Sequence, residues 1–231
     1  MFLPFDDTSI AFAWRSDAEL KKAYWLFRVM SKVAAVSFGN FLLNVAIKIH
    51  FPIAWLVKPT IFKHFVGGES LNECIPLVKK MGEFNVCSIL DYSVEGSNSE
   101  KSYQSTFDEI VRSIKKASEH SEITFAVFKP TGLIDVGILE KISTRIKLTD
   151  YELKQFDNFS ARIDQLCDLA SSLNTPILID AEDTWYQQAI DDVAAKMMSK
   201  YNTSKAIVYN TLQMYRAVSY THLTLPKKRI V

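Results

Sequence analysis

Short apolar runs alternate with longer amphipathic stretches from residue 85 onward. The apolar runs predict β-strands, and they cover residues 85–93, 122–130, 175–182 and 205–215. The stretches between them predict helices at about 103–119, 150–173 and 184–201. Strands and helices that alternate in this way indicate an α/β protein with a parallel sheet, and continuous apolar runs are typical of a sheet covered on both faces.

The residues before this alternation predict helices only. Ser16 and Asp17 resemble an N-cap, and apolar residues at helical spacing follow them as far as Val36. A second helix is expected over 38–50 and a third over 70–81, after a loop at 67–70. We therefore predict a helical region at 1–84, followed by a sheet-containing region at 85–216.

The most apolar stretch of the chain is Val33 to Ile47. It is shorter than the roughly 20 residues that a membrane span needs, and it contains Asn40 and Asn44. We expect a buried helix here, and the alternative is a helix that lies on a membrane surface. The acidic start of the chain does not fit a signal peptide.

Composition excludes several classes of protein. The chain has 231 residues and a net charge of +1, so its charge gives no sign of a nucleic-acid partner. The three cysteines, Cys74, Cys87 and Cys167, are scattered, which favours a reducing compartment. The sequence contains no zinc-binding, dinucleotide-binding or P-loop motif, and we predict no metal site.

Polar residues stand at the carboxyl end of every predicted strand. An open doubly wound sheet and a (β/α)8 barrel both fit the order of elements, but a barrel collects its active site from such strand ends. We therefore favour a barrel. The polar residues in question are Asp91, Glu95, Lys129, Asp180, Glu182 and Gln213.

Each of these residues also has an ordinary structural interpretation. Lys129 and Asp180 could form an ion pair at the rim of the core. Glu182 and Asp183 could stabilise the start of the next helix, where carboxylates complement the helix dipole. Glu95 could be a solvated loop acid, and Gln213 could bond a neighbouring backbone group. These patterns alone name no substrate.

Five motifs in order resemble the proline dehydrogenase family, in particular its stand-alone bacterial type. They are KPTIFKHFVGGES, SILDYSVEG, FAVFKPTGL, LIDAEDTWYQQAIDDV and AIVYNTLQMYR. The resemblance implies a distorted (β/α)8 barrel that holds FAD at the strand ends. It also implies oxidation of L-proline to Δ1-pyrroline-5-carboxylate by hydride transfer to FAD, with a membrane quinone as electron acceptor. The implied place is the cytoplasm, with a peripheral contact on the inner face of the membrane.

The same resemblance implies roles for individual residues. Lys129 matches the family's active-site lysine near the flavin, and Asp180 matches its active-site aspartate. Gln213 matches a glutamine that contacts the flavin. Glu95 matches a glutamate that pairs with a substrate-binding arginine. Such groups would orient flavin and substrate and tune the flavin's electronics.

The likeness that we find ends at Arg216, whereas family members continue with four more βα units and the arginines that grip proline. We therefore predict a partial barrel, the first half, and a non-family tail at 217–231, for which an artefactual origin is favoured and a genuine divergent C-terminus is the alternative. We expect this truncated chain to bind FAD poorly and to be inactive. Two alternatives are a non-catalytic half-barrel that binds a membrane or partner, and an aldolase that uses Lys129 as a Schiff base.

Overall fold

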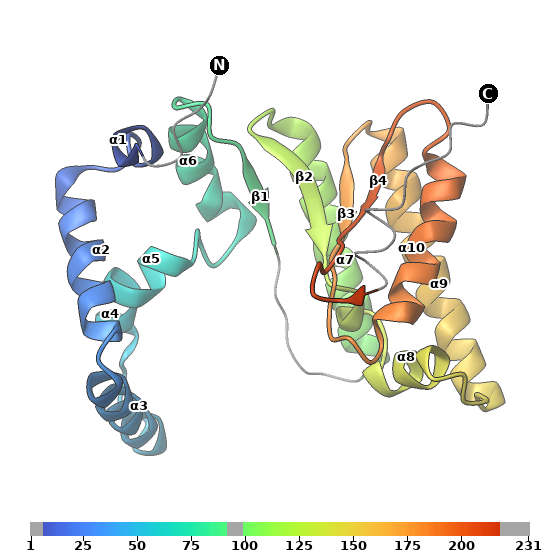
Figure 1. The fold of residues 1–231 in the computed structure, drawn as a ribbon, viewed down its shortest axis with the longest axis horizontal. Helices are drawn as coiled ribbons and strands as arrows, with labels where there is room; N and C mark the ends of the chain where they lie inside the picture. Colours follow the sequence, from blue (N-terminus) through green and yellow to red (C-terminus); the bar gives the residue numbers. More distant parts are fainter. Residues whose placement is uncertain (1–6, 92–98, 218–231) are drawn as a thin grey trace. The chain divides into compact units, whose positions relative to one another are not determined.

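Figure 1 shows the computed structural model of the chain, which describes residues 7–91 and 99–217. The chain divides into two compact units, Met1–Cys87 and Ser88–Val231. The division falls close to the boundary after residue 84 that the sequence predicts. Each unit is described by itself below.

The first unit consists of helices. Its helices are α1 Thr8–Ala11, α2 Asp17–Met30, α3 Val33–Lys48, α4 Ala54–Val57, the π-helical η1 Lys58–Phe62, α5 Lys63–Phe65 and α6 Leu71–Gly82. The predicted N-cap of α2 is confirmed, because the Ser16 hydroxyl accepts a hydrogen bond from the Glu19 amide while the Glu19 carboxylate accepts one from the Ser16 amide. Ser70 caps α6 in the same position, as expected.

The helix predicted to run unbroken to Val36 is in fact two helices. α2 ends at Met30, and α3 leaves it at an angle of 93°. The Ser31 hydroxyl bonds back to the Arg28 carbonyl at 2.9 Å, and Lys32 is extended, so the local bonds end the helix. Within the described residues no single helix has the length and hydropathy of a membrane span, although α2 and α3 taken together reach both.

The expectation of a buried helix at Val33 to Ile47 is wrong. No residue of α3 is buried, and Val33 and Phe41 are 81% and 61% exposed. Ser37, Asn40, Asn44 and Lys48 form one narrow polar stripe, and apolar residues cover the rest of the helix surface, which is more than a single neighbouring element could cover. Hydropathy predicts that such side chains are buried away from water, but it does not predict which surface covers them.

The second unit is built on a parallel sheet. Its strands are β1 Ser88–Leu90, β2 Ile123–Phe128, β3 Ile177–Ile179 and β4 Val208–Asn210, and they lie in the order β1-β2-β3-β4. This confirms the predicted α/β class with a parallel sheet. Parallel strands that follow one another in sequence order, with right-handed crossovers, place their connecting helices on one face.

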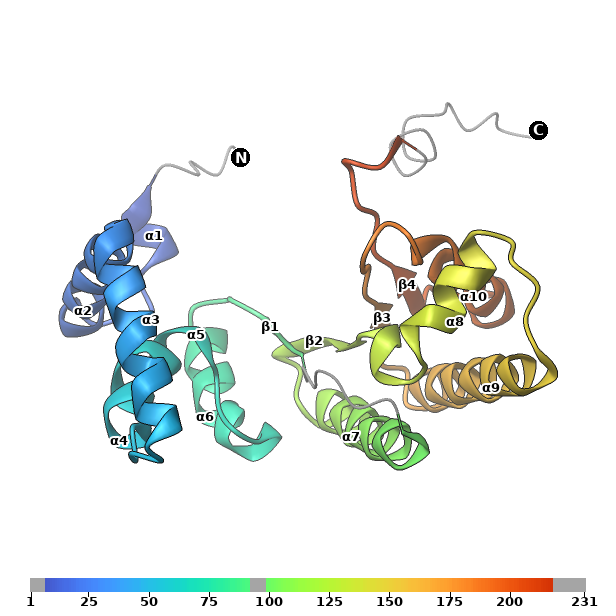
Figure 2. The ribbon, with the colours of Figure 1, turned by 90° about the horizontal axis from the view of Figure 1, so that it is seen from below.

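The helices of the second unit pack beside this sheet, as Figures 1 and 2 show. They are α7 Glu100–Glu119, α8 Val136–Ser143, α9 Asp150–Ser172 and α10 Gln187–Tyr201, with a short 3-10 turn, η2, at Pro130–Gly132. α7 contacts β2, α10 contacts β4, and α9 contacts both of these helices. The sequence did not predict α8 or η2, which occupy the connection after β2.

The two faces of the sheet differ. Ala126, Ile177 and Val208 lie side by side on one face and are at most 1% exposed. On the other face the rings of Phe125 and Tyr209, from β2 and β4, meet edge to face at 4.9 Å across the intervening strand. This face is only partly buried among the described residues, so the predicted cover on both faces is not found there. The contact is consistent with a sheet that curves toward this face.

Candidate functional site

The residues that follow β2, β3 and β4 stand next to one another at the carboxyl edge of the sheet. The Asp180 amide donates to the Phe128 carbonyl at 3.1 Å, and the Thr211 amide donates to the Ile179 carbonyl at 3.2 Å. The register therefore aligns Lys129 with Asp180 and Asp180 with Thr211. Because side chains alternate along a strand, all three continue the face that carries Phe125 and Tyr209, which is the partly open one.

Lys129 pairs with a different carboxylate from the one the sequence suggested. Its Nζ lies 4.0 Å from Asp91 Oδ2, and both side chains are partly exposed. Lys129 and Asp180, both within the described residues, form no ion pair. Asp180 Oδ1 instead accepts the amide of Ala181 at 2.9 Å. Glu95 lies outside the described residues, so its role stays a prediction.

Glu182 holds the loop after β3 against the turn after β2. Its two carboxylate oxygens accept hydrogen bonds from the Thr131 amide at 2.8 Å and the Thr131 hydroxyl at 2.7 Å. Burial raises the pKa of the Glu182 carboxyl above its ordinary value of 4.5, while the bonds from Thr131 and the charge of Lys129 oppose the rise. Glu182 therefore links the ends of β2 and β3 by direct hydrogen bonds. This is a more specific role than the favourable charge at a helix start that the sequence analysis considered.

This raised pKa gives the stability a pH dependence. Above pH 4.5 the folded protein binds more protons at Glu182 than the unfolded chain does, so the free energy of unfolding falls as the pH rises toward the raised pKa. We expect Glu182→Gln to remove this slope, because the Thr131 hydroxyl can turn to accept from the new amide. Urea unfolding between pH 4.5 and 7 measures it. The exposed Glu140→Gln is the control, and an unchanged slope in Glu182→Gln would contradict the assignment.

Two polar atoms at this edge are buried and have no hydrogen-bond partner among the described residues. They are the Thr211 hydroxyl oxygen and the Gln213 carbonyl oxygen, Oε1. The other end of the Gln213 amide is used, because Nε2 donates to the Glu182 carbonyl at 2.6 Å. Buried polar groups usually have a hydrogen-bond partner. Two buried oxygens without a partner at one edge therefore mark a place where a ligand can supply the missing hydrogen bonds.

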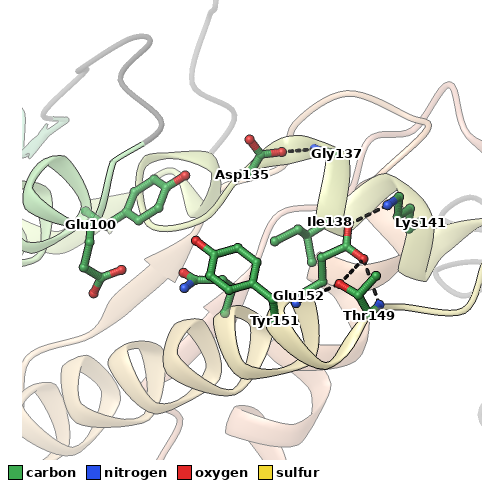
Figure 3. A pocket seen from close by; sticks show the side chains of 10 residues that line it. Glu100, Asp135, Gly137, Ile138, Lys141, Thr149, Tyr151 and Glu152 are labelled. Atoms are coloured by element: carbon green, nitrogen blue, oxygen red, sulfur yellow. Dashed lines mark hydrogen bonds and ion pairs between the residues drawn. The ribbon is translucent and has the colours of Figure 1, made fainter.

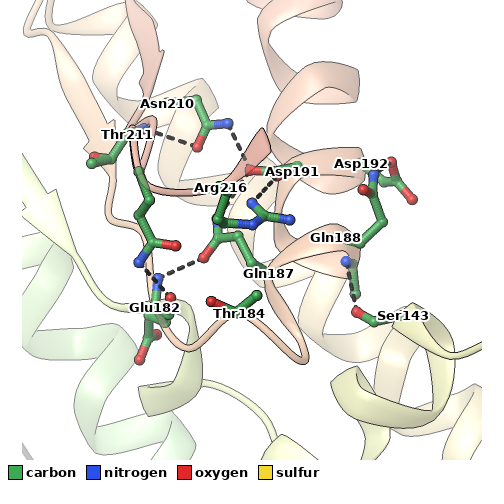
Figure 4. Close-up of polar contacts among 12 residues, drawn as sticks. Ser143, Glu182, Thr184, Gln187, Gln188, Asp191, Asp192, Asn210, Thr211 and Arg216 are labelled. Carbon is green, nitrogen blue, oxygen red and sulfur yellow. Dashed lines mark hydrogen bonds and ion pairs between the residues drawn. The ribbon is translucent and has the colours of Figure 1, made fainter. Parts of the chain in front are cut away.

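A polar network behind these atoms connects α10 with the loops after β3 and β4 (Figure 4). Asp191 lies at its centre and accepts from Gln187 Nε2 at 2.9 Å, Asn210 Nδ2 at 3.0 Å and Arg216 Nη1 at 2.9 Å. Gln187 is fully buried, and its Oε1 accepts the Glu182 amide at 2.6 Å. The network fixes the backbone that presents Gln213.

The residues between Glu182 and α10 form a turn. Tyr186 is 7% exposed, and its hydroxyl donates to Asp183 at 3.1 Å. Burial and the nearby carboxylates raise the pKa of Tyr186 to about 12. The preceding residue, Trp185, is 58% exposed, so Tyr186 packs into the protein whereas Trp185 does not.

A cavity of about 470 Å³ lies elsewhere in the second unit, among α7, α8 and α9 (Figure 3). Three of its charged residues already have ion-pair partners: Lys141 pairs with Glu152 within the lining, and Glu100 pairs with Arg162 outside it. The bond from Lys141 and those from Thr149 lower the pKa of Glu152 to about 2. The cavity therefore has no strand-end residue and few unpaired charges with which to attract a ligand.

Sequence reasoning missed several residues of the strand-end site. Gln187 and Asp191 are four residues apart on one helix, a spacing at which an amide and a carboxylate can bond, so this pair was readable. Thr131, Thr211 and the Asp191–Arg216 pair depend on contacts between distant segments and had no local signal.

Comparison with known proteins gives a consistent answer. The family model for proline dehydrogenase matches residues 74–228, which extends beyond Arg216, where the sequence analysis ended the likeness. The mitochondrial proline dehydrogenase 1 of Dictyostelium discoideum is 27% identical, over 90% of this chain and 43% of that protein. The carbapenem antibiotics biosynthesis protein CarD of Pectobacterium carotovorum is 29% identical, over 65% of this chain and 40% of that protein.

A solved structure shares the fold. It is proline utilization A from Bdellovibrio bacteriovorus, inactivated by N-propargylglycine, with a TM-score of 0.57 and 14% identity over 94% of this chain and 22% of that one. The chain thus spans about two fifths of the length of the curated relatives named above. The family model covers more than half of the chain. The chain therefore belongs to the proline dehydrogenase family.

Proposed function

We propose that this chain forms the first half of a (β/α)8 barrel in a flavin-dependent enzyme that oxidises L-proline to Δ1-pyrroline-5-carboxylate. The observation that supports it is the strand-end site, where Lys129, Asp180 and Thr211 stand side by side on the partly open face. A sheet whose strands follow in sequence order supports the barrel, because the doubly wound alternative reverses its order at a switch point.

The described residues fit a flavin. An isoalloxazine ring is flat and apolar on its faces and polar along its edge. The half-buried aromatic contact of Phe125 and Tyr209 offers an apolar surface, and Thr211 and Gln213 offer two buried polar atoms without partners. Lys129 adds a positive charge at the same edge. Held there, FAD would supply the hydride acceptor.

The residues of this chain would bind the flavin and the substrate and orient them. Lys129 favours negative charge that develops beside it, since a fixed cation at a partly desolvated edge stabilises such charge. Glu182 is already bonded to Thr131, so we assign it to holding the loop and not to proton transfer. Gln213 would offer the ligand a hydrogen-bond acceptor, and Asp180 would present a carboxylate at the same strand-end edge.

The test is steady-state reduction of an artificial dye by the protein, expressed from its complete gene and purified with its flavin. We expect reduction that depends on L-proline. Since a hydroxyproline dehydrogenase of Xenopus laevis is 21% identical over 96% of this chain, 4-hydroxyproline is the competing substrate to compare. Flavin-loaded protein that reduces the dye with neither substrate would contradict the proposal.

Two other functions make different predictions. A non-catalytic half-barrel that binds a partner would hold no flavin. A Schiff-base aldolase needs its lysine neutral in an apolar site, whereas Lys129 is 44% exposed and faces Asp91. Trapping with borohydride and a carbonyl substrate would detect such an enzyme, and we expect no adduct at Lys129.

We also propose that α2 and α3 contact a membrane, at the inner face of the cytoplasmic membrane, where a quinone would accept the electrons. The acidic residues of α2, Asp17 and Glu19, lie in its first turn, whereas residues 20–68 contain no Asp or Glu and carry exposed aromatic side chains such as Trp25 and Phe41. Basic and aromatic residues without acids suit an anionic lipid surface. The basic residues of this stretch are Lys21, Lys22, Arg28, Lys32, Lys48, Lys58 and Lys63.

Co-sedimentation with vesicles tests this contact. We expect binding to vesicles that contain phosphatidylserine, weaker binding at high salt, and a loss of several-fold in Phe41→Ser. The matched control is Tyr151→Ser, which changes a residue of α9 that is 71% exposed. Equal binding by wild type and Phe41→Ser would rule out this surface.

A further inference from the structure

The amide of Gln213 has a fixed polarity. Its Nε2 donates to the Glu182 carbonyl, which can only accept, so the nitrogen must lie on that side. Its Oε1 is then the atom left over, and it is buried without a partner among the described residues. The unpartnered atom that Gln213 offers to whatever binds beside it is therefore an acceptor.

The Glu182 carbonyl, to which Gln213 donates, is held in place by α10. The amide of Glu182 donates to Gln187 Oε1 at 2.6 Å, and Gln187 Nε2 donates to Asp191 Oδ1 at 2.9 Å. The Glu182 amide only donates and the Asp191 carboxylate only accepts, so both groups favour the same orientation of the Gln187 amide. Through Gln187, Asp191 on α10 therefore holds the backbone of Glu182 in place.

Asp191 is itself held firmly. Arg216 donates to Oδ2 at 2.9 Å and Asn210 donates to Oδ1 at 3.0 Å, and the two side chains of the ion pair are 9% and 20% exposed. Three donors from three different segments therefore fix the position of this carboxylate. By contrast, its neighbour Asp192 is exposed and bonds only the exposed Gln188 among the described residues.

We propose that Asp191 is a positioning residue which, through Gln187, holds the backbone of Glu182 in place, so that the Glu182 carbonyl keeps Gln213 where its acceptor oxygen meets an N–H donor of the bound ligand. This inference rests on the proposed function, under which the ligand is the flavin, whose ring carries an imide N–H. Asp191 touches no ligand in this arrangement, and its effect passes through Gln213.

A double-mutant cycle tests the inference on the complete protein, with the flavin dissociation constant as the readout and the melting temperature measured in parallel. Gln213→Leu removes the acceptor and is expected to weaken flavin binding about tenfold. Asp191→Asn keeps the shape but weakens the bonds that hold Gln187 and the Glu182 backbone, and it is expected to weaken binding several-fold in the wild-type background and not at all in Gln213→Leu. Its effect on melting temperature should be the same in both backgrounds.

Equal weakening by Asp191→Asn in both backgrounds would overturn the inference, because the residue would then act on the fold alone. Gln187→Met is the second variant should Asp191→Asn not fold, and the same dependence on Gln213 is expected. Asp192→Asn is the control and should change nothing. A folded wild type that binds no flavin would overturn the proposed function together with the inference, whereas flavin binding with additive losses overturns the inference alone.

Discussion

We expect Leu166→Ala to lower the free energy of unfolding by about 3 kcal/mol, as complete burial of a leucine implies. Leu166 is 0% exposed on the face of α9 that also buries Phe159 and Ile163. Truncation removes apolar surface from this core and leaves a cavity that helices already fixed by their neighbours fill only in part. Urea denaturation followed by circular dichroism measures the change.

The matched control is Leu153→Ala, the same substitution on the same helix. Leu153 is 48% exposed, so we expect a loss below about 1 kcal/mol. Similar losses in the two variants would mean that α9 does not bury the face described here.

Lys129→Met should separate function from stability. Its ion pair with Asp91 spans 4.0 Å and is partly exposed, so we expect stability to change by less than about 1 kcal/mol. Loss of the cation at the strand-end site should lower proline-dependent turnover about 100-fold. Dye reduction and urea denaturation of the same preparation give both values.

Lys141→Met is the control for this prediction. Lys141 is 41% exposed and pairs with Glu152 in the cavity away from the strand ends. We expect turnover close to that of the wild type. A loss of turnover in Lys141→Met as large as in Lys129→Met would show that removal of any lysine from this unit impairs the enzyme.

The alternation of apolar runs and amphipathic stretches was enough to predict the parallel sheet and its order of elements. The boundaries were less predictable. The helix expected from Thr184 begins at Gln187, because the Asp183 carbonyl accepts the Tyr186 and Gln187 amides in a turn first. α8 had a readable start, since Asp135 caps it through the Gly137 amide at 2.7 Å.

The partner of Lys129 could not be predicted, because it depends on register. The pairing of β1 with β2 shifts between Ser88 and Ile89, and Leu90 then lies beside Ala126. Strand order brings several carboxylates to one edge, but a shift of one residue decides which of them meets the lysine. The pair of Asp191 and Arg216 could not be predicted either, because it joins α10 to the loop after β4 and has no local sequence signal.

Residue types at the strand ends therefore predicted where a site would lie, while the hydrogen bonds between the loops could be known only from the structure. Gln213 was expected to contact a ligand or a backbone group, and the structure shows the backbone contact through Nε2, while Oε1 has no partner among the described residues. Its contact with a flavin stays a prediction, as does the role of Asp180.

Anaerobic addition of L-proline to the flavin-loaded complete protein tests the central claim most directly, through the flavin absorbance near the visible maximum. Hydride transfer from proline should bleach this absorbance at once, with Δ1-pyrroline-5-carboxylate formed in equal amount. Flavin that stays oxidised in the presence of saturating proline, in protein shown to be folded, would contradict the account.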